Sequence, residues 1–96
     1  MTTEAGPIRI VIADDHHLVR QGFRAMLNRL ASMEVVAEAS TAQEAVEQYA
    51  RHQPDILLLD LRFPDQNGTV AIRAIRKQFV SARIIVLTTF DCEEDC

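Results

Sequence analysis

The hydrophobic positions of the chain form short apolar runs separated by segments with helical spacing. Four runs have the length and composition typical of strands: Ile8–Ala13, Val35–Ala39, Ile56–Asp60 and Ile84–Leu87. The third begins with four successive apolar residues, which predicts a strand buried on both faces. The second alternates imperfectly and predicts a shorter, less regular strand.

Three helices are predicted between these runs. The first, His17–Leu30, has apolar residues at intervals of three and four: Val19, Phe23, Met26, Leu27 and Leu30. The second opens on Thr41 and Glu44, which form a capping box, and ends before Pro54. It carries one apolar face: Ala42, Ala45, Val46 and Tyr49. The third has an apolar set of residues that we expect to face inward, namely Ala71, Ile72, Ile75 and Phe79. Its basic residues are expected to face outward, namely Arg73, Arg76 and Lys77.

The order of these elements, βαβαβαβ with short links, predicts an α/β fold with a parallel sheet and right-handed crossovers. The chain has 96 residues, of which 48% are hydrophobic. That length fits one domain, and the composition supports a packed core. We therefore expect residues 1–96 to form a single domain.

Acidic residues follow two of the predicted strands. Asp60 closes the third apolar run, and Asp14 with Asp15 follows the first. In open α/β sheets, the carboxyl ends of the strands border the binding crevice. Converging carboxylates repel one another unless they share a cation, and hard oxygen ligands suit Mg²⁺. The pattern predicts an acidic, Mg²⁺-binding pocket in which one carboxylate can act as a nucleophile.

Ordinary structural roles remain open for several of these residues. Asp14 or Asp15 can cap the helix that begins near His17, with or without a bound cation. The basic residues of the third helix fit a solvated surface. The histidines fit solvated surface positions, and the cysteines fit free thiols in a reducing compartment: His16, His17 and His52, with Cys92 and Cys96.

The net charge of the chain limits the classes of partner that it is expected to bind. A formal net charge of -4 opposes general affinity for nucleic acid or for anionic membranes. No apolar run is long enough to span a bilayer, and residues 1–7 lack the features of a signal peptide. We expect a cytoplasmic protein that neither binds nucleic acid directly nor contacts a membrane.

Three motifs in order give the chain a family resemblance. They are Asp14–Asp15–His16, Asp60–Pro64 with Gly68, and Val86–Asp91. With these motifs, the chain from about Ile8 to Asp95 resembles a response-regulator receiver domain of the NarL/LuxR type. The resemblance implies a flavodoxin-like or CheY-like doubly wound sheet, here with four strands in the order 2-1-3-4.

The resemblance also implies roles for the acidic residues. Asp60 matches the acceptor that takes a phosphoryl group from a sensor histidine kinase and becomes an acyl phosphate. Asp15 matches a direct Mg²⁺ ligand, and Asp14 the acid that helps to hold the ion. Arg62 matches the position whose backbone carbonyl is a further ligand. The expected cofactor is Mg²⁺, and the chain is expected to be a phospho-acceptor rather than an enzyme.

Two threonines complete the implied site. Thr88 matches the hydroxyl that turns to bond the phosphoryl group, and Thr89 matches a neighbour whose backbone amide contacts it. Thr88 also fits the ordinary role of a β-branched strand residue. Gly68 is expected to shape the loop after Asp60 through its freedom at positive φ.

Receiver domains have five strands, and this sequence stops just past the fourth. We therefore expect a C-terminally truncated receiver without the last helix–strand–helix unit, its lysine, or a DNA-binding domain. Lys77, on an outward helix face, cannot replace that lysine, so phosphorylation is expected to be impaired. Ile84–Leu87 would become an edge strand. Self-association through this edge and the His17–Leu30 surface, as a homodimer or larger assembly, is expected.

Two other functions are considered. One is a protein–protein association module that keeps the receiver scaffold for dimerisation or sequestration without switching. The other is a haloacid-dehalogenase-like phosphatase, which would need a second acid where Arg62 stands. Nucleotide-binding folds lack support because the glycines are scattered, with no phosphate-binding loop.

Overall fold

The fold is described from a computed structural model, which defines residues 6–61, 63 and 67–87. Within these ranges the chain forms four strands and three helices. The strands are β1 (Ile8–Ala13), β2 (Met33–Ala39), β3 (Ile56–Asp60) and β4 (Ile84–Leu87). The helices are α1 (His17–Asn28), α2 (Ala42–His52) and α3 (Gly68–Gln78).

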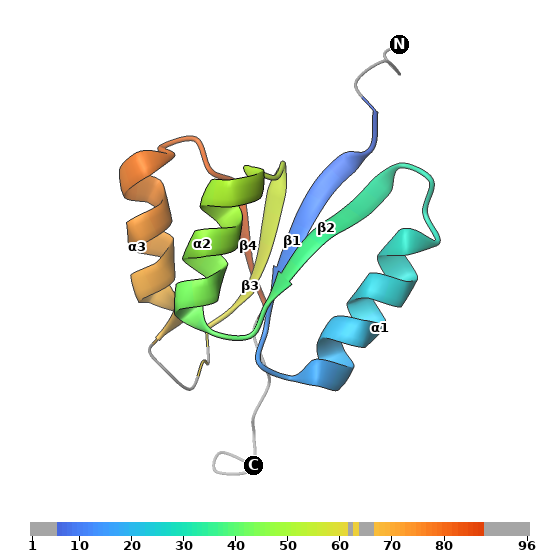
Figure 1. Cartoon of the computed structure of the whole chain (residues 1–96), viewed down its shortest axis with the longest axis horizontal. Coiled ribbons are helices and arrows are strands. Elements are labelled where there is room, and N and C mark those ends of the chain that lie inside the picture. Colours follow the sequence, from blue (N-terminus) through green and yellow to red (C-terminus); the bar gives the residue numbers. More distant parts are fainter. Residues whose placement is uncertain (1–5, 62, 64–66, 88–96) are drawn as a thin grey trace.

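The strands form one parallel sheet in the order β2-β1-β3-β4. This confirms the predicted doubly wound arrangement and its strand order. In the register, Ala13 pairs with Leu59, and Asp60 pairs with Leu87. All strands point the same way in Figure 1, so the C-terminal ends of the neighbouring strands β1 and β3 lie side by side.

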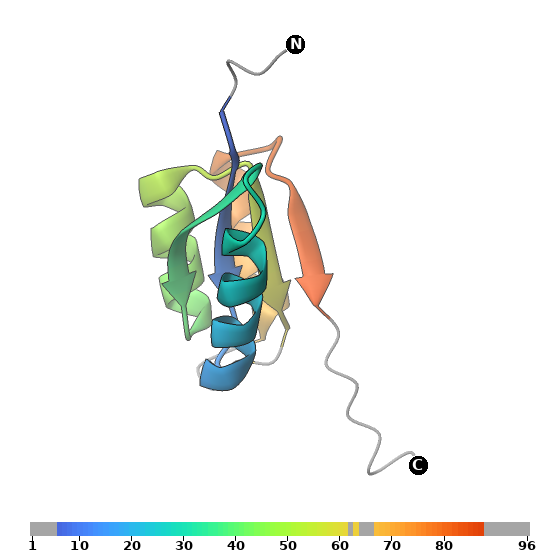
Figure 2. The ribbon, with the colours of Figure 1, turned by 90° about the vertical axis from the view of Figure 1, so that its right-hand side faces the viewer.

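The helices cover the sheet from both sides. Figures 1 and 2 show α1 on one face, and α2 and α3 together on the other. The main buried cluster belongs to the sheet, to α2 and to α3, and includes Leu57, Leu59, Tyr49 and Ile75. The rings of Tyr49 and Phe79 lie 5.1 Å apart, a favourable tilted pair. None of the helices within the described ranges is long and apolar enough to cross a membrane.

The α1 helix differs from its prediction. It ends at Asn28 instead of Leu30, and none of its residues is buried. Val19 and Met26, two members of the predicted apolar stripe, are 39% and 54% exposed. The helix packs over β1 and β2, and this contact covers only part of its apolar face. Periodicity predicted the helix correctly, but it overestimated its burial.

Two strand predictions need correction. The β2 strand begins at Met33 rather than Val35, because Met33 pairs with Ile8 in the β1 register. The β3 strand has the predicted bounds, but only Leu57 and Leu59 on one face are fully buried, with Asp60 at its end. Ile56 and Leu58, on the other face, are half-buried, since α1 covers that side incompletely.

The α2 helix is capped as predicted at its start. The Thr41 hydroxyl accepts a hydrogen bond from the Glu44 amide at 3.0 Å. The Glu44 carboxylate accepts from the backbone amide and the hydroxyl of Ser40, one residue before the N-cap. At the other end, Gln53 adopts the left-handed conformation with φ 44°, so the helix stops before Pro54.

Gly68 begins α3 and packs directly on the backbone that follows Asp60. Its amide donates a hydrogen bond of 2.8 Å to the carbonyl of Leu61. A Cβ on Gly68 would lie 2.7 Å from Leu61 Cα and 2.8 Å from the Asp60 carbonyl oxygen. The glycine is therefore required by close backbone approach. The expectation that it uses positive φ is wrong, since Gly6 is the positive-φ glycine of the described residues.

We predict that Gly68→Ala destabilises the fold by about 1–3 kcal/mol, because backbone atoms must move to admit the methyl group. Gly22→Ala is the matched control: it lies within α1, where an added Cβ meets nothing within 4 Å. That control should instead stabilise the protein by about 0.5–1 kcal/mol, through helix propensity. Urea unfolding followed by circular dichroism measures both, and equal stability of the two variants would refute the close-approach argument.

Candidate functional site

Three aspartates come together where β1 and β3 end. Asp14 directly follows β1, and Asp60 is the last residue of β3. Because Ala13 and Leu59 are paired in the register, the two carboxylates leave adjacent strands at the same level. One ligand atom from each of Asp14, Asp15 and Asp60, with one from His16, lie within 4.8 Å of one another. The parallel sheet thus brings together the acids that the sequence placed at separate strand tips.

The three carboxylates differ in exposure. The side chain of Asp60 is 1% exposed and that of Asp14 is 4% exposed, whereas Asp15 is 33% exposed. Two buried carboxylates with a third beside them repel one another strongly, so the group needs positive charge close by. Asp15 is the carboxylate most open to solvent.

His16, when protonated, supplies part of this charge, a role that was not predicted from the sequence. Its Nδ1 lies 2.8 Å from Asp14 Oδ1, 3.1 Å from Asp15 Oδ1 and 3.8 Å from Asp60 Oδ2. The hydrogen bond to Asp14 raises the pKa of His16 above 6.5; desolvation opposes this, and the charges of the acids add to it. Its ring is half exposed, as expected for a surface histidine, yet it points into the acidic cluster. The sequence did contain one signal for this role, since His16 directly follows Asp14 and Asp15 at the end of a predicted strand.

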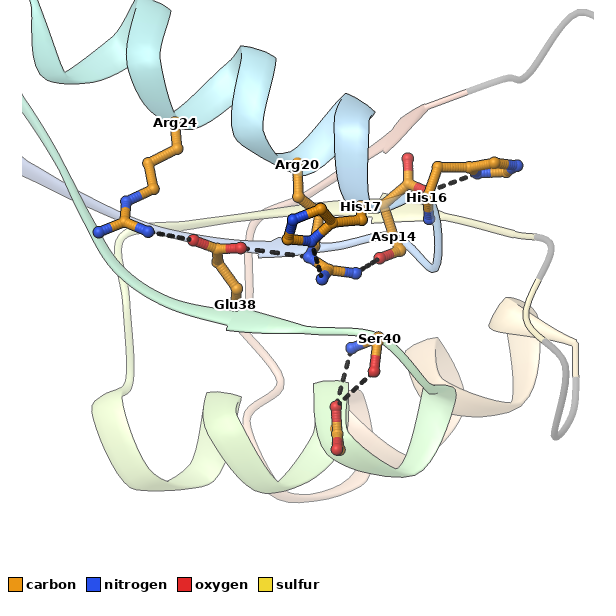
Figure 3. A network of polar contacts seen from close by, with 8 residues as sticks. Asp14, His16, His17, Arg20, Arg24, Glu38 and Ser40 are labelled. Carbon is orange, nitrogen blue, oxygen red and sulfur yellow. Dashed lines mark hydrogen bonds and ion pairs between the residues drawn. The ribbon is translucent and has the colours of Figure 1, made fainter.

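Asp14 is held by its backbone as well as its side chain. Its amide donates to the Ala39 carbonyl of β2 at 2.9 Å. Its Oδ1 accepts from the His16 amide at 2.8 Å, and Figure 3 shows the ring of His16 turned toward the same carboxylate. The N-cap of α1 is His16. The alternative that Asp14 or Asp15 is the N-cap of this helix is therefore wrong.

Several predicted site residues lie outside the described residues: Arg62, Thr88 and Thr89, together with Pro64 and the cysteines Cys92 and Cys96. The described part of the predicted site is Asp14, Asp15 and Asp60. The structure adds His16 to these three, because its ring lies within the same cluster.

The donor set fits a divalent cation. Three carboxylates offer hard oxygen ligands, which Mg²⁺ prefers, and two of them are fixed at the ends of buried strands. Their mutual repulsion in the absence of an ion favours binding of positive charge. The cluster is therefore chemically suited to Mg²⁺, with His16 occupying the neighbouring space.

Comparison with protein families gives one match over almost the whole chain. The model of the response regulator receiver domain matches residues 10–96. Among curated proteins, the oxygen regulatory protein NreC of Staphylococcus epidermidis is 46% identical over 88 residues. That alignment covers 91% of this chain and 40% of NreC. The chain thus spans about two-fifths of the length of this relative.

Solved structures agree with this match. A two-component response regulator of the LuxR family from Aurantimonas superimposes with a TM-score of 0.82 and 40% identity, over 88% of this chain and 61% of that one. The signal receiver domain of the putative response regulator NarL from Mycobacterium tuberculosis gives 0.82 and 34%, over 90% of this chain and 69% of that one. The family match, which begins within β1, and these relatives show that the chain belongs to the response-regulator receiver domain family, among receivers of the NarL/LuxR type.

Proposed function

We propose that Asp60 accepts a phosphoryl group from a sensor histidine kinase in the cytoplasm, with Mg²⁺ bound at the acidic cluster. The family is one of two-component signalling domains. The observation that carries the assignment to Asp60 is its place in the structure. It is a nearly fully buried carboxylate at the end of β3, with ligand atoms of Asp14 and Asp15 within 4.8 Å.

In the proposed reaction, a carboxylate oxygen of Asp60 bonds to phosphorus as the bond from phosphorus to the kinase histidine breaks. The electron pair of the broken bond stays on the kinase imidazole, whose other ring nitrogen carries a proton, so the products are an acyl phosphate on Asp60 and a neutral histidine on the kinase. Asp14, Asp15, Asp60 and the backbone carbonyl of Arg62 would hold the cation. When bound, Mg²⁺ supplies screening of the repulsion between the carboxylate and the incoming phosphoryl group.

Thr88 and Thr89 are proposed to contact the phosphoryl group, through a hydroxyl and a backbone amide respectively. The register supports this, because Leu87, the residue before Thr88, pairs with Asp60. The domain is a signalling module rather than a classical enzyme. Acceptance of the phosphoryl group and hydrolysis of the acyl phosphate are the reactions that we propose for it.

The relatives suggest a role in transcription regulation for the whole protein. One solved relative is described as a response regulator of the LuxR family, and this domain alone is acidic, with a net charge of -4. Acidic balance opposes contact with DNA phosphates. We therefore propose that residues 1–96 receive the signal and do not bind nucleic acid themselves.

Incubation with acetyl phosphate and Mg²⁺ should add one phosphoryl group to the chain, detected by intact-protein mass. The adduct should be absent without Mg²⁺ and absent in Asp60→Asn, because the acceptor carboxylate and its screening ion are then missing. Asp55→Asn is the control, since Asp55 precedes β3 at the opposite end of the strand. An adduct of equal yield on a folded Asp60→Asn variant would contradict the assignment.

The cation and the His16 proton should compete, because both neutralise the same carboxylates. Since the pKa of His16 is raised above 6.5, its protonated form stabilises the metal-free fold at low pH, and this contribution is lost as pH rises through the raised pKa. Calorimetric Mg²⁺ affinity should accordingly increase between about pH 6 and about pH 8.

Two variants check this competition. His16→Asn should lose most of the pH dependence, whereas Asp15→Asn should weaken Mg²⁺ binding at both pH values by removing a ligand. An unchanged pH dependence in His16→Asn would show that the imidazole does not compete with the ion.

We also propose that the domain associates with a second copy of itself, through the β4 edge and the α1 surface. The β4 strand lies at an edge of the described sheet, with Ile85 49% and Val86 40% exposed. An apolar edge strand offers backbone groups that pair with another strand. On α1, Leu18 and Met26 are also exposed, at 79% and 54%. A two-fold contact of β4 with its own copy would satisfy the edge and cover Ile85 and Val86. The exposed side chains of α1, which packs over β1 and β2, would belong to a separate contact.

Ile85→Lys should shift the chain toward monomer, because a charge on an edge strand opposes strand pairing. Sedimentation velocity over a range of concentrations measures the shift. Val80→Lys is the control: Val80 is 81% exposed but lies outside β4, in the connection between α3 and β4. A concentration-independent monomer in the unsubstituted protein would rule out self-association.

A further inference from the structure

The side chain of Arg20 reaches from α1 to the backbone of the acidic cluster. Its Nη1 donates a hydrogen bond of 2.6 Å to the carbonyl oxygen of Asp14, and its Nε donates to Glu38 Oε1 at 3.1 Å. Its Nη2 lies 3.2 Å from His17 Nδ1. The side chain is only 14% exposed, and Figure 3 shows the guanidinium between Asp14 and Glu38. This arginine is therefore part of the packed structure behind the site.

The hydrogen bond from Arg20 holds the second of the two backbone polar groups of Asp14. The Asp14 amide is already held by the carbonyl of Ala39 in β2, at 2.9 Å. With Arg20 on its carbonyl, Asp14 is anchored at both backbone polar groups. The carbonyl belongs to the peptide that joins Asp14 to Asp15, so its orientation helps to set the backbone from which both carboxylate side chains extend. Ion-binding side chains need such support to stay within about 0.5 Å of the required geometry.

Glu38 fixes Arg20 in turn. It lies on β2 beside Ile12 of β1, so its backbone is part of the sheet. One of its carboxylate oxygens accepts from Arg20, and the other accepts from Arg24 at 3.3 Å. A cationic guanidinium close to the cluster would by itself oppose the binding of a divalent cation. Glu38 offsets that charge while it holds the arginine in place.

We infer that Arg20, held by Glu38, is a positioning residue that fixes the Asp14–Asp15 peptide and thereby the geometry of the cation site. The part of this inference that concerns Mg²⁺ rests on the proposed function. Arg20 touches none of the reacting atoms. It acts through the backbone that carries two of the three acids.

The geometry requires arginine rather than any cation at this position. The three nitrogens of the planar guanidinium contact three different groups, namely the Asp14 carbonyl, the Glu38 carboxylate and the His17 imidazole. A lysine ammonium is a point charge on a flexible stem and cannot reproduce this fork. Arg20→Lys therefore keeps the charge and removes the positioning, which separates the two effects.

The experiment compares Arg20→Lys with Arg24→Lys in the 96-residue chain. Both residues lie on α1 and both pair with Glu38, but Arg24 is 61% exposed, and the carbonyl of Asp14 is held by Arg20. Loss of groups that support metal ligands weakens metal binding by about tenfold to hundredfold. We expect a loss of that size for Arg20→Lys, and a change within about twofold for Arg24→Lys, an exposed pair. Urea unfolding verifies that both variants are folded.

A second readout does not depend on the cation. In the metal-free protein, the backbone amide resonances of Asp15 and His16 report the orientation of the Asp14–Asp15 peptide and the residue after it. Arg20→Lys should shift both resonances, Glu38→Gln should shift them in the same direction, and Arg24→Lys should leave them in place. The Arg20→Lys/Glu38→Gln double variant should lose little more Mg²⁺ affinity than the worse single variant, because the two residues act as a unit.

The outcomes separate the inference from the proposed function. If the unsubstituted protein binds no Mg²⁺, the proposed function fails, and the amide resonances alone decide the role of Arg20. If it binds Mg²⁺ and Arg20→Lys retains both the affinity and the resonances, the inference is overturned and the proposed function stands. Equal losses in Arg20→Lys and Arg24→Lys would also overturn it, since the effect would then come from general weakening of α1.

Discussion

The mutual repulsion of three carboxylates is the constraint on which the site depends. The parallel pairing of β1 with β3 forces it, because the register of Ala13 with Leu59 brings Asp14 and Asp60 to adjacent strand tips. Neither acid lies in solvent, since Asp14 directly follows β1, Asp60 ends β3, and both are buried. The cluster therefore requires positive charge. The protonated form of His16 would supply part of it, and a divalent cation would supply more.

The backbone around the cluster is fixed by contacts from three other elements. Gly68 brings the start of α3 against the backbone of Asp60 and Leu61. The β2 strand holds the amide of Asp14 through Ala39. The α1 helix contributes Arg20, whose guanidinium holds the carbonyl of Asp14. These contacts fix the backbone that carries the acids and so oppose their separation. Ion binding and phosphoryl transfer need such preorganisation.

Much of this arrangement could be predicted from the sequence. The bounds of β1, β3 and β4 match the apolar runs because burial and strand length are local signals. The convergence of the acids follows from the rule for strand ends in parallel sheets. The contact of Arg20 with Glu38 joins residues 18 positions apart, and no local pattern indicates it. The exposure of Val19 and Met26 was missed for a related reason: an amphipathic stripe shows that a helix has an apolar face, but not how much of it the sheet covers.

The same geometry ties the stability of the domain to its chemistry. Asp14 and Asp60 occupy positions where an apolar residue would add to the core, and their charges oppose folding while no cation is bound. An ion that binds the folded chain and not the unfolded one stabilises the fold in proportion to its affinity. Cation binding and folding are coupled because the strands that build the core also carry the acids. Residues such as Arg20 and Gly68, which lie outside the cluster, then influence ion affinity through the positions of those strand ends.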